Sequence, residues 1–267
     1  MTKTLFLVPL CSILMAATCN SYNRVLKSSD RNYKLERAME YYNKGNYYRA
    51  LPLLEELLTA FRGDTMVETV YYYYCHTHFG QGTYVMAAQY FKHFHNSFPH
   101  SRYAEEMLWK HALSFVKLSP SPDLDQTYTR KAIDAFQLYV NLYPASTRVT
   151  EANAQVDKLW KKLEIKDFNS AMLYYDRGQY KAAAVTFENV LEDYPASDQA
   201  ENIEFLRVQS LYLLAANSTE RKRLSRYSDA LKACTAFEAA YPGSQFNRDI
   251  SKMKQQSLQI INTSTIP

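Results

Sequence analysis

Apolar side chains recur every three or four residues through most of the chain, a spacing that places them on one face of an α-helix. Between residues 147 and 177 the pattern continues without Gly or Pro. This favours one long helix over two segments with a bend near 165–167. The last periodic segment, residues 245–261, would end the fold as a capping helix. The pattern predicts an all-α protein.

A repeat organises these helical segments. Five stretches of the sequence align on an alanine: Ala50, Ala87, Ala132, Ala183 and Ala230. In three of them a glycine stands five residues earlier, with a tyrosine two residues after it: Gly45, Gly82 and Gly178. Twelve residues after the alanine, four stretches place an aromatic residue and a proline, followed two residues later by a serine: Ser101, Ser146, Ser197 and Ser244. The first stretch has Asp64 in place of the serine.

Each residue type has a physical reason to occupy its position in the repeat. Glycine adopts the positive φ that ends a helix and lets the chain reverse. Alanine lets two antiparallel helices approach closely, and the tyrosine can pack back across the turn. Proline lacks an amide hydrogen and stops the second helix. Serine or aspartate then caps the next helix by accepting hydrogen bonds from its free amides.

Helix, tight turn, helix, proline and cap is the tetratricopeptide pattern, whose usual period is about 34 residues. The units are longer here, with polar insertions at 118–123 and 216–223. We therefore expect an α-solenoid of about five helix pairs with a carboxy-terminal capping helix. Its structural repeat residues would be Gly45, Ala50, Gly82, Ala87, Ala132, Gly178, Ala183 and Ala230.

The amino terminus has the features of an export signal. Lys3 precedes an apolar run that is too short to span a bilayer as a mature helix. Residues 15–19, Met-Ala-Ala-Thr-Cys, resemble a bacterial lipobox, although Ala16 and Thr18 depart from its usual residues. We predict a signal peptide over 1–18, a lipidated Cys19 and a flexible tether over 19–29. Ordinary cleavage that leaves Cys19 as a thiol is the alternative.

Composition narrows the functional classes. Hydrophobic residues make up 47% and charged residues 22%, which suits a helical protein with packed apolar faces. The net charge of +4 is not gathered into a basic stripe, so nucleic acid is not expected as a partner. The 23 tyrosines combine an apolar body with a polar tip, and they favour a binding surface.

Motifs for catalysis or metal binding are absent from the sequence, including phosphate-binding glycine loops, Gly-x-Ser-x-Gly, His-Glu-x-x-His and Cys-x-x-Cys. All six histidines lie within residues 76–111. His-x-His spacing on a helix turns the two rings about 200° apart, so they do not converge on a metal. Cys75 and Cys234 lie in helical patterns, where buried thiols are commoner than a disulfide. We expect no enzyme activity, no cofactor and no metal.

Tetratricopeptide units with a Tyr-Pro-x-Ser junction, behind a signal that ends in a candidate lipid-bearing cysteine, resemble the BamD family of outer-membrane β-barrel assembly lipoproteins. The closest stretch runs from Tyr143 to Gly178, and the resemblance covers about residues 30–245. It implies an outer-membrane lipoprotein that faces the periplasm and serves the β-barrel assembly (BAM) machinery. Its partners would be a BamA-like barrel protein and unfolded outer-membrane proteins. A periplasmic tetratricopeptide adaptor for cell-envelope or cell-division complexes is the alternative.

The resemblance also divides the chain by role. Residues 30–118 would accept peptides, residues 119–262 would dock the barrel protein, and residues 263–267 would form a tail. In tetratricopeptide solenoids the first helix of each pair lines the concave face, which places on it Leu35, Met39, Tyr42, Tyr72, His76 and Phe79. On the long helix, exposed cations would steer an acidic partner: Arg148, Lys158, Lys161, Lys162 and Lys166.

Overall fold

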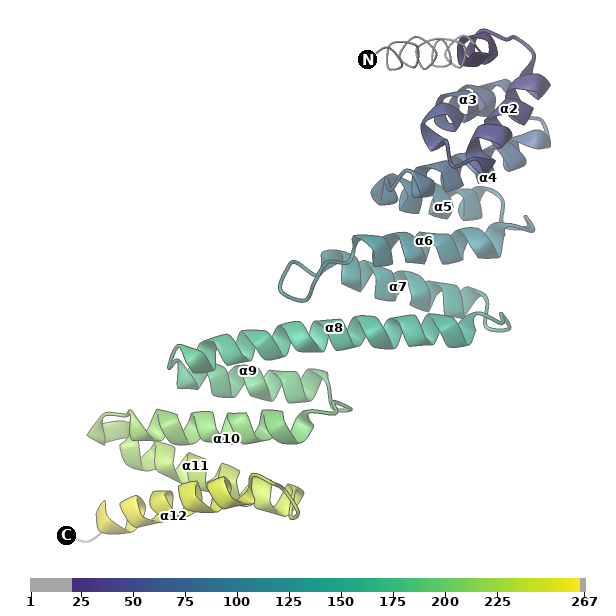
Figure 1. Cartoon of the computed structure of the whole chain (residues 1–267). Helices are drawn as coiled ribbons and strands as arrows, with labels where there is room; N and C mark the ends of the chain where they lie inside the picture. The colour runs from purple at the N-terminus through teal and green to yellow at the C-terminus, as the bar shows by residue number, and fades with distance from the viewer. Residues whose placement is uncertain (1–20, 265–267) are drawn as a thin grey trace, which may run out of the picture. The chain divides into compact units, whose positions relative to one another are not determined.

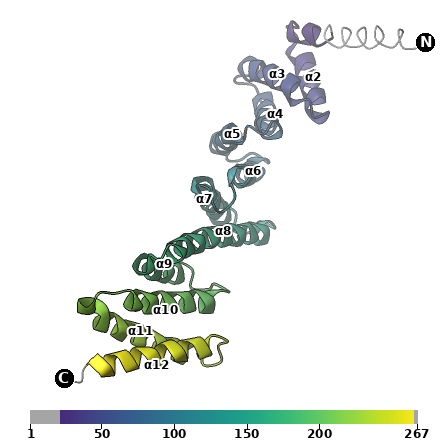
Figure 2. The same cartoon turned by 60° about the vertical axis from the view of Figure 1, so that its left-hand side comes forward.

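A computed structural model describes residues 21–264, and every regular element in that range is helical. The helices are α2 (Arg31–Asn43), α3 (Tyr47–Ala60), α4 (Met66–Gly80), α5 (Tyr84–Ser97), α6 (Ala104–Leu118), α7 (Thr127–Leu142), α8 (Val149–Asp176), α9 (Tyr180–Asp193), α10 (Ala200–Ala216), α11 (Glu220–Ala240) and α12 (Asn247–Ser264). Consecutive helices from α2 to α11 form five antiparallel pairs, and α12 packs on α11 (Figures 1 and 2). The fold is the tetratricopeptide-type solenoid with a capping helix that the repeat predicts.

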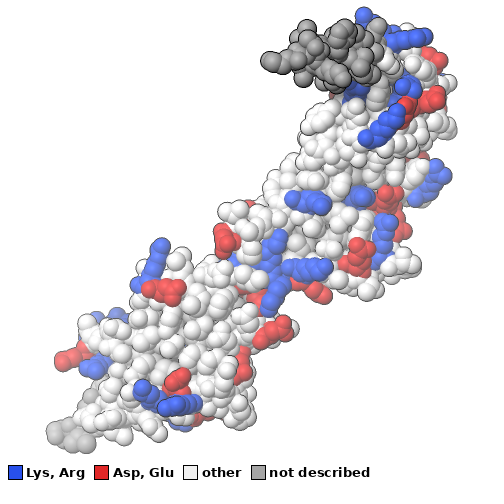
Figure 3. All heavy atoms as spheres, in the orientation of Figure 1, with Lys and Arg blue, Asp and Glu red and all other residues white. Residues whose placement is uncertain are grey.

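The chain forms two compact units. Unit 1 contains the residues up to Pro120 together with Gln126–Leu159, and unit 2 contains Ser121–Asp125 and the residues from Trp160 onward. The division falls inside α8, because this helix is 28 residues long and contributes its first part to unit 1 and the rest to unit 2. The division at 118/119 expected from the sequence is one of role, which the compactness of the two units does not test. On the displayed face of each unit, cations and anions are interspersed (Figure 3).

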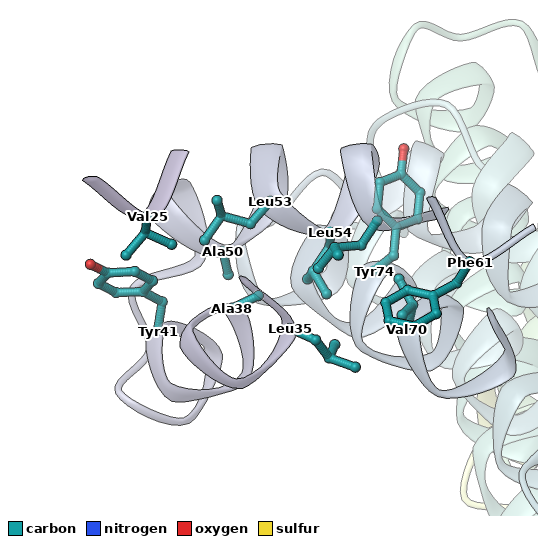
Figure 4. Close-up of a cluster of buried hydrophobic side chains, with 11 residues drawn as sticks. Val25, Leu35, Ala38, Tyr41, Ala50, Leu53, Leu54, Phe61, Val70 and Tyr74 are labelled. Carbon is teal, nitrogen blue, oxygen red and sulfur yellow. The ribbon is translucent and has the colours of Figure 1, made fainter. Parts of the chain in front are cut away.

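The core of the first helix pair shows how the apolar stripes are used. Leu35 and Ala38 of α2 face Leu53 and Leu54 of α3, and Val70 of α4 joins the same cluster (Figure 4). All are at most 5% exposed. Full burial of a leucine or valine contributes about 1.5–3 kcal/mol relative to exposure, so this pair gains most of its stability from the stripes rather than from helix propensity.

The repeat residues occupy the turns and the contacts between paired helices. Gly45, Gly82 and Gly178 have φ values of 71°, 78° and 70°. The tyrosine that follows each glycine packs back on an aromatic ring of the preceding helix: Tyr47 on Tyr42, Tyr84 on Phe79, and Tyr180 on Tyr175, with ring centroids 5.2 to 5.8 Å apart. The aligned alanines are 0% exposed: Ala50, Ala87, Ala132, Ala183 and Ala230.

The serine after each proline accepts a hydrogen bond from the amide two residues further on, at 3.0 to 3.1 Å, and Asp64 does the same in the first unit. Three of these serines also donate to a carboxylate of the preceding helix pair: Ser101 to Glu68, Ser146 to Glu105, and Ser197 to Glu164. The serine therefore joins successive repeats, a role that the sequence did not indicate, and it bonds to the amide of the residue just before the next helix.

The segment after Cys19 corrects one expectation. Residues 21–26 are helical, Val25 is 1% exposed in the first core cluster, and the Tyr22 hydroxyl donates to the Arg49 carbonyl at 3.2 Å. The tether predicted over 19–29 is therefore wrong for this part. Because polar residues dominate this segment, its sequence did not indicate that the apolar pair Val25 and Leu26 packs on α2 and α3.

The predicted signal peptide over 1–18 and the lipidation site Cys19 lie outside the described residues. So do residues 265–267 of the expected tail. Among the helices of residues 21–264, none is both long enough and apolar enough to cross a membrane.

Candidate functional site

Five tyrosines in unit 1 form a chain of ring contacts, here called the aromatic surface: Tyr42 on α2, Tyr47 on α3, Tyr72 and Tyr73 on α4, and Tyr103 just before α6. The centroids of successive rings are 5.6 Å (Tyr47 to Tyr42), 5.0 Å (Tyr42 to Tyr73), 5.4 Å (Tyr73 to Tyr72) and 4.4 Å (Tyr72 to Tyr103) apart. All five side chains are half-buried. The rings hold one another in place while part of each stays open to solvent.

Local sequence explains this arrangement. The turn at Gly45 brings Tyr47 back onto Tyr42, while Gly80 leaves room on α4 for the Tyr47 ring, which a Cβ at position 80 would overlap. Consecutive residues on a helix point about 100° apart, so Tyr73 reaches back to Tyr42 while its neighbour Tyr72 reaches forward to Tyr103. Two adjacent tyrosines of one helix therefore connect three helix pairs.

The electrostatics favour binding through neutral polar groups. Burial raises the pKa of Tyr42 to about 12 and, assisted by the nearby Glu106 carboxylate, raises that of Tyr72 further. Both hydroxyls therefore stay protonated at neutral pH and can donate. Glu106 of α6 places a carboxylate oxygen 3.5 Å from the Tyr72 hydroxyl, and the Lys110 ammonium lies 5.1 Å from the Phe79 ring centroid. The surface thus offers aromatic faces, hydroxyl groups and one charge of each sign.

The residues that the sequence placed on the concave face differ in exposure: four are half-buried and two are buried. Met39, Tyr42, Tyr72 and Phe79 are half-buried, and each packs against a core cluster with part of its side chain exposed. Leu35 is only 5% exposed and belongs to the core between α2 and α3, so it does not line a groove.

His76 is also buried, at 8% exposure, between Tyr72 and Phe91. The expectation that it lines a groove is therefore wrong. An i, i+4, i+7 stripe identifies one face of a helix, but only the packing of α5 decides how much of that face stays open. Tyr73, which the stripe omitted, links the two helix pairs. The run Tyr71–Tyr74 was the signal for it, since four consecutive tyrosines cover every side of a helix.

Three of the six clustered histidines, His76, His78 and His111, are buried core residues. Burial lowers the pKa of His76 and of His111 to about 4, and it also lowers that of His78. The His111 Nδ1 atom donates to the Ala88 carbonyl at 2.8 Å. In residues 21–264, no group of three or more His, Cys, Asp or Glu side chains is arranged to hold a metal ion.

Cys75 is buried in unit 1 and Cys234 in unit 2, and both are free thiols. Burial raises the pKa of each, that of Cys234 to about 11. A buried thiol with a raised pKa is a poor nucleophile, so neither position is suited to thiol chemistry.

The cations on α8, together with Arg148 just before it, are less available to a partner than the sequence suggested. The Arg148 guanidinium lies over the Trp109 ring at 5.6 Å, Lys161 pairs with Glu164 at 2.9 Å, and the Lys166 ammonium donates to the Leu124 carbonyl at 2.9 Å. Three of the five cations expected to steer a partner are therefore engaged within the chain. Lys158 is exposed.

Comparison with solved structures gives two similar chains. One is the TPR domain of P58(IPK), with a TM-score of 0.42 and 12% identity, covering 92% of this chain and 69% of that one. The other is the TPR2AB domain of yeast Sti1, solved with pHSP90, also with a TM-score of 0.42 and 12% identity, covering 86% of this chain and 98% of that one.

Two curated proteins are similar in sequence. The chain is 25% identical over 226 residues to an Aquifex aeolicus (strain VF5) protein assigned as outer membrane protein assembly factor BamD, a match that covers 84% of this chain and 74% of that protein. It is 28% identical over 169 residues to the outer membrane protein assembly factor BamD of Neisseria meningitidis serogroup A (strain Z2491), covering 59% and 62% of the two chains.

The family model described as YfiO, outer membrane lipoprotein, matches residues 28–223 and 172–259. These ranges take in all the helix pairs, including the aromatic surface of unit 1 and the junctions at Tyr143 and Tyr194. The chain therefore belongs to the YfiO family of outer membrane lipoproteins, to which its resemblance to BamD also pointed.

Proposed function

We propose that this outer membrane protein assembly factor is a non-catalytic scaffold, anchored by lipid at Cys19 and facing the periplasm. In this proposal it binds unfolded outer-membrane proteins through unit 1 and a BamA-like barrel protein through its carboxy-terminal repeats. Family membership and the two BamD relatives support the assembly role. The partners and their binding surfaces are the part that we add.

The aromatic surface is the observation that carries the proposal for unit 1. Partly exposed tyrosines held by ring contacts present a large apolar area with little side-chain entropy left to lose on binding. Unfolded outer-membrane proteins expose apolar and aromatic side chains on extended backbone. Such segments can stack on tyrosine rings while their backbone groups pair with the hydroxyls.

The test is crosslinking of the purified chain to a peptide from the carboxy terminus of an outer-membrane barrel. The triple variant Tyr42→Ala, Tyr72→Ala, Phe79→Ala removes two rings of the aromatic surface and the half-buried Phe79 ring of the same cluster as Tyr72, so we expect crosslinking to fall strongly. The variant Tyr48→Ala is the matched control, because Tyr48 is 79% exposed on α3 and makes none of the surface ring contacts. Undiminished crosslinking of a triple variant with wild-type circular dichroism would rule out the aromatic surface.

The barrel partner is tested by pull-down from detergent-solubilised membranes. We expect the full chain to recover a BamA-like protein. A chain that ends at Leu159 keeps all the residues of unit 1, and it lacks the second part of α8 and all of α9 to α12. That shortened chain should lose the partner. If it still recovers the barrel protein while unit 1 stays folded, docking does not lie in the carboxy-terminal repeats.

The anchor is tested by membrane fractionation. Stable attachment needs more than one acyl chain, as in bacterial lipoproteins. We expect Cys19→Ala, expressed without the barrel partner, to move from the outer-membrane fraction to the soluble fraction. Unchanged fractionation would refute lipidation at Cys19 as the anchor.

A further inference from the structure

A basic pocket lies in unit 2, between α9, α10 and the beginning of α11. Its volume is about 590 Å³, and its charged lining residues are Lys181, Arg207, Arg221, Lys222 and Arg226 with Glu188 and Asp229. Cations therefore outnumber anions around the pocket. The same face contributes the apolar side chains of Val185, Leu211 and Leu214.

The five cations fall into two groups. Arg207 donates to both oxygens of Glu204 at 2.7 Å and lies 3.4 Å from Glu188, so its charge is satisfied within the protein. Arg226 donates to the Ser218 hydroxyl at 2.6 Å, which fixes it beside the α10–α11 turn without neutralising it.

The remaining cations are Lys181, Arg221 and Lys222, all exposed, and none forms an ion pair with another residue of the 21–264 range. Together with Arg226 they surround the pocket with positive charge that the protein itself does not neutralise. One lining carboxylate, Asp229, remains to oppose them once Glu188 is assigned to Arg207.

The start of α11 adds an independent indication. Arg221, Lys222 and Arg223 occupy the first turn of this helix, where Glu220 is the only acidic residue. The amino-terminal end of a helix carries partial positive charge and favours anions. The side chain of the N-cap residue Thr219 makes no capping hydrogen bond. Three cations in this turn oppose the helix dipole, and a bound anion would relieve that repulsion.

The mouth of the pocket is apolar as well as basic. The lining residue Val185 is 49% exposed, and the lining residue Leu214 is half-buried. Cations beside an exposed aliphatic side chain suit a surface that rests at the boundary between lipid headgroups and acyl chains.

We propose that this pocket binds the phosphate-bearing headgroup of an anionic membrane lipid, with Lys181, Arg221 and Lys222 contacting the phosphate and Val185 resting against the acyl boundary. The site goes beyond the scaffold function. It gives an outer membrane lipoprotein a second membrane contact, independent of the acyl anchor at Cys19 and of the aromatic surface.

The test is flotation of the full chain carrying Cys19→Ala, so that no acyl group contributes, with lipid vesicles. We expect binding to vesicles of phosphatidylglycerol and phosphatidylcholine, weak binding to phosphatidylcholine alone, and loss of the difference at high salt. The variant Arg221→Gln, Lys222→Gln should lower partition onto the anionic vesicles roughly thirtyfold, because each of the two cations contributes a similar share of the binding free energy at an anionic bilayer.

Lys232→Gln, Arg248→Gln is the matched control, because both are exposed cations of unit 2 outside the pocket. It should keep wild-type partition. Equal partition on both vesicle types, or equal losses in the two double variants, would overturn the proposal. Binding of inorganic phosphate or of polyglutamate that depends on Arg221 and Lys222, without binding of vesicles, would also overturn it by assigning the pocket to a soluble anion or an acidic polypeptide.

Discussion

The same kind of turn occurs beside two different surfaces of the molecule. One such turn joins α2 to α3 in unit 1, and the other joins α8 to α9 in unit 2. Gly45 and Gly178 both adopt positive φ, and in both pairs the following tyrosine packs back on the preceding helix. Beyond the turn, unit 1 links its tyrosines into a chain of ring contacts. Unit 2 instead leaves Tyr174 40% exposed and surrounds a pocket with cations.

This difference shows which positions the repeat constrains. The turn glycine, the contact alanine and the cap are set by backbone geometry and helix packing, so they recur in both units. The faces of the helices are constrained only where a neighbour covers them. The same solenoid therefore presents an aromatic surface in one unit and a basic pocket in the other.

Low pH should distinguish the units most strongly, because all six histidines lie at 76–111 in unit 1. The pKa of His76 and of His111 is lowered to about 4, so the unfolded chain binds protons more tightly. Their contribution to stability is present above pH 6.5 and is lost as pH falls towards 4, up to about 3 kcal/mol for each. Hydrogen exchange against pH should show unit 1 losing protection first.

His76→Phe should remove its share of that pH dependence, since Nε2 of His76 makes no hydrogen bond, although a Glu106 carboxylate oxygen lies 3.5 Å from it. Equal loss of protection in both units between pH 6.5 and 4 would contradict the assignment to buried histidines.

Overpacking the repeat alanines tests what the two units share. Ala87→Leu in unit 1 and Ala183→Leu in unit 2 add volume at positions with 0% exposure, so each should lower the free energy of unfolding by about 1–3 kcal/mol. Ala239→Leu is the control, because Ala239 is exposed on α11. Unchanged thermal stability of either buried variant would count against a shared repeat register.

Gly178→Ala isolates the cost of the turn. A Cβ at this position meets nothing within 4 Å, so the expected loss of about 1–2 kcal/mol comes from the backbone at φ 70° alone. Gly243→Ala also enters open space, but its φ is not positive, and it should be neutral. Similar thermal melting of the two variants would refute the conformational explanation.

The junction serines should give the smallest effects. The Ser146 hydroxyl accepts from the Arg148 amide just before α8 and also bonds to Glu105 at 2.6 Å and to the Tyr139 hydroxyl at 2.8 Å. The Ser244 hydroxyl shows only the equivalent bond, from the Phe246 amide just before α12. Each serine-to-alanine change should cost about 1 kcal/mol for this bond to the amide, with Ser146→Ala the larger. Equal denaturant midpoints would mean that the bond to Glu105 adds no stability.

Much of the fold follows from sequence because its signals are local. The helix at 149–176 could be predicted since neither Gly nor Pro interrupts it. The pair boundaries could be predicted from the recurring junction of an aromatic residue, a proline and, two residues later, a serine. The candidate site was predictable only in part. Tyr42 and Tyr72 were found from their stripe, whereas Leu35 and His76 shared that stripe and are buried.

By itself the sequence determined the all-α repeat, the five helix pairs and the family, because each depends on residue types at fixed spacing along one chain. The tertiary structure decided that Val25 belongs to the core, that Tyr73 joins Tyr42 to Tyr72, and that the cations of α9 and α11 surround one pocket. These features depend on side chains from different helices. The burial of a side chain and the electrostatic potential at it depend on all the groups around it. Residue spacing within a single segment therefore does not specify them.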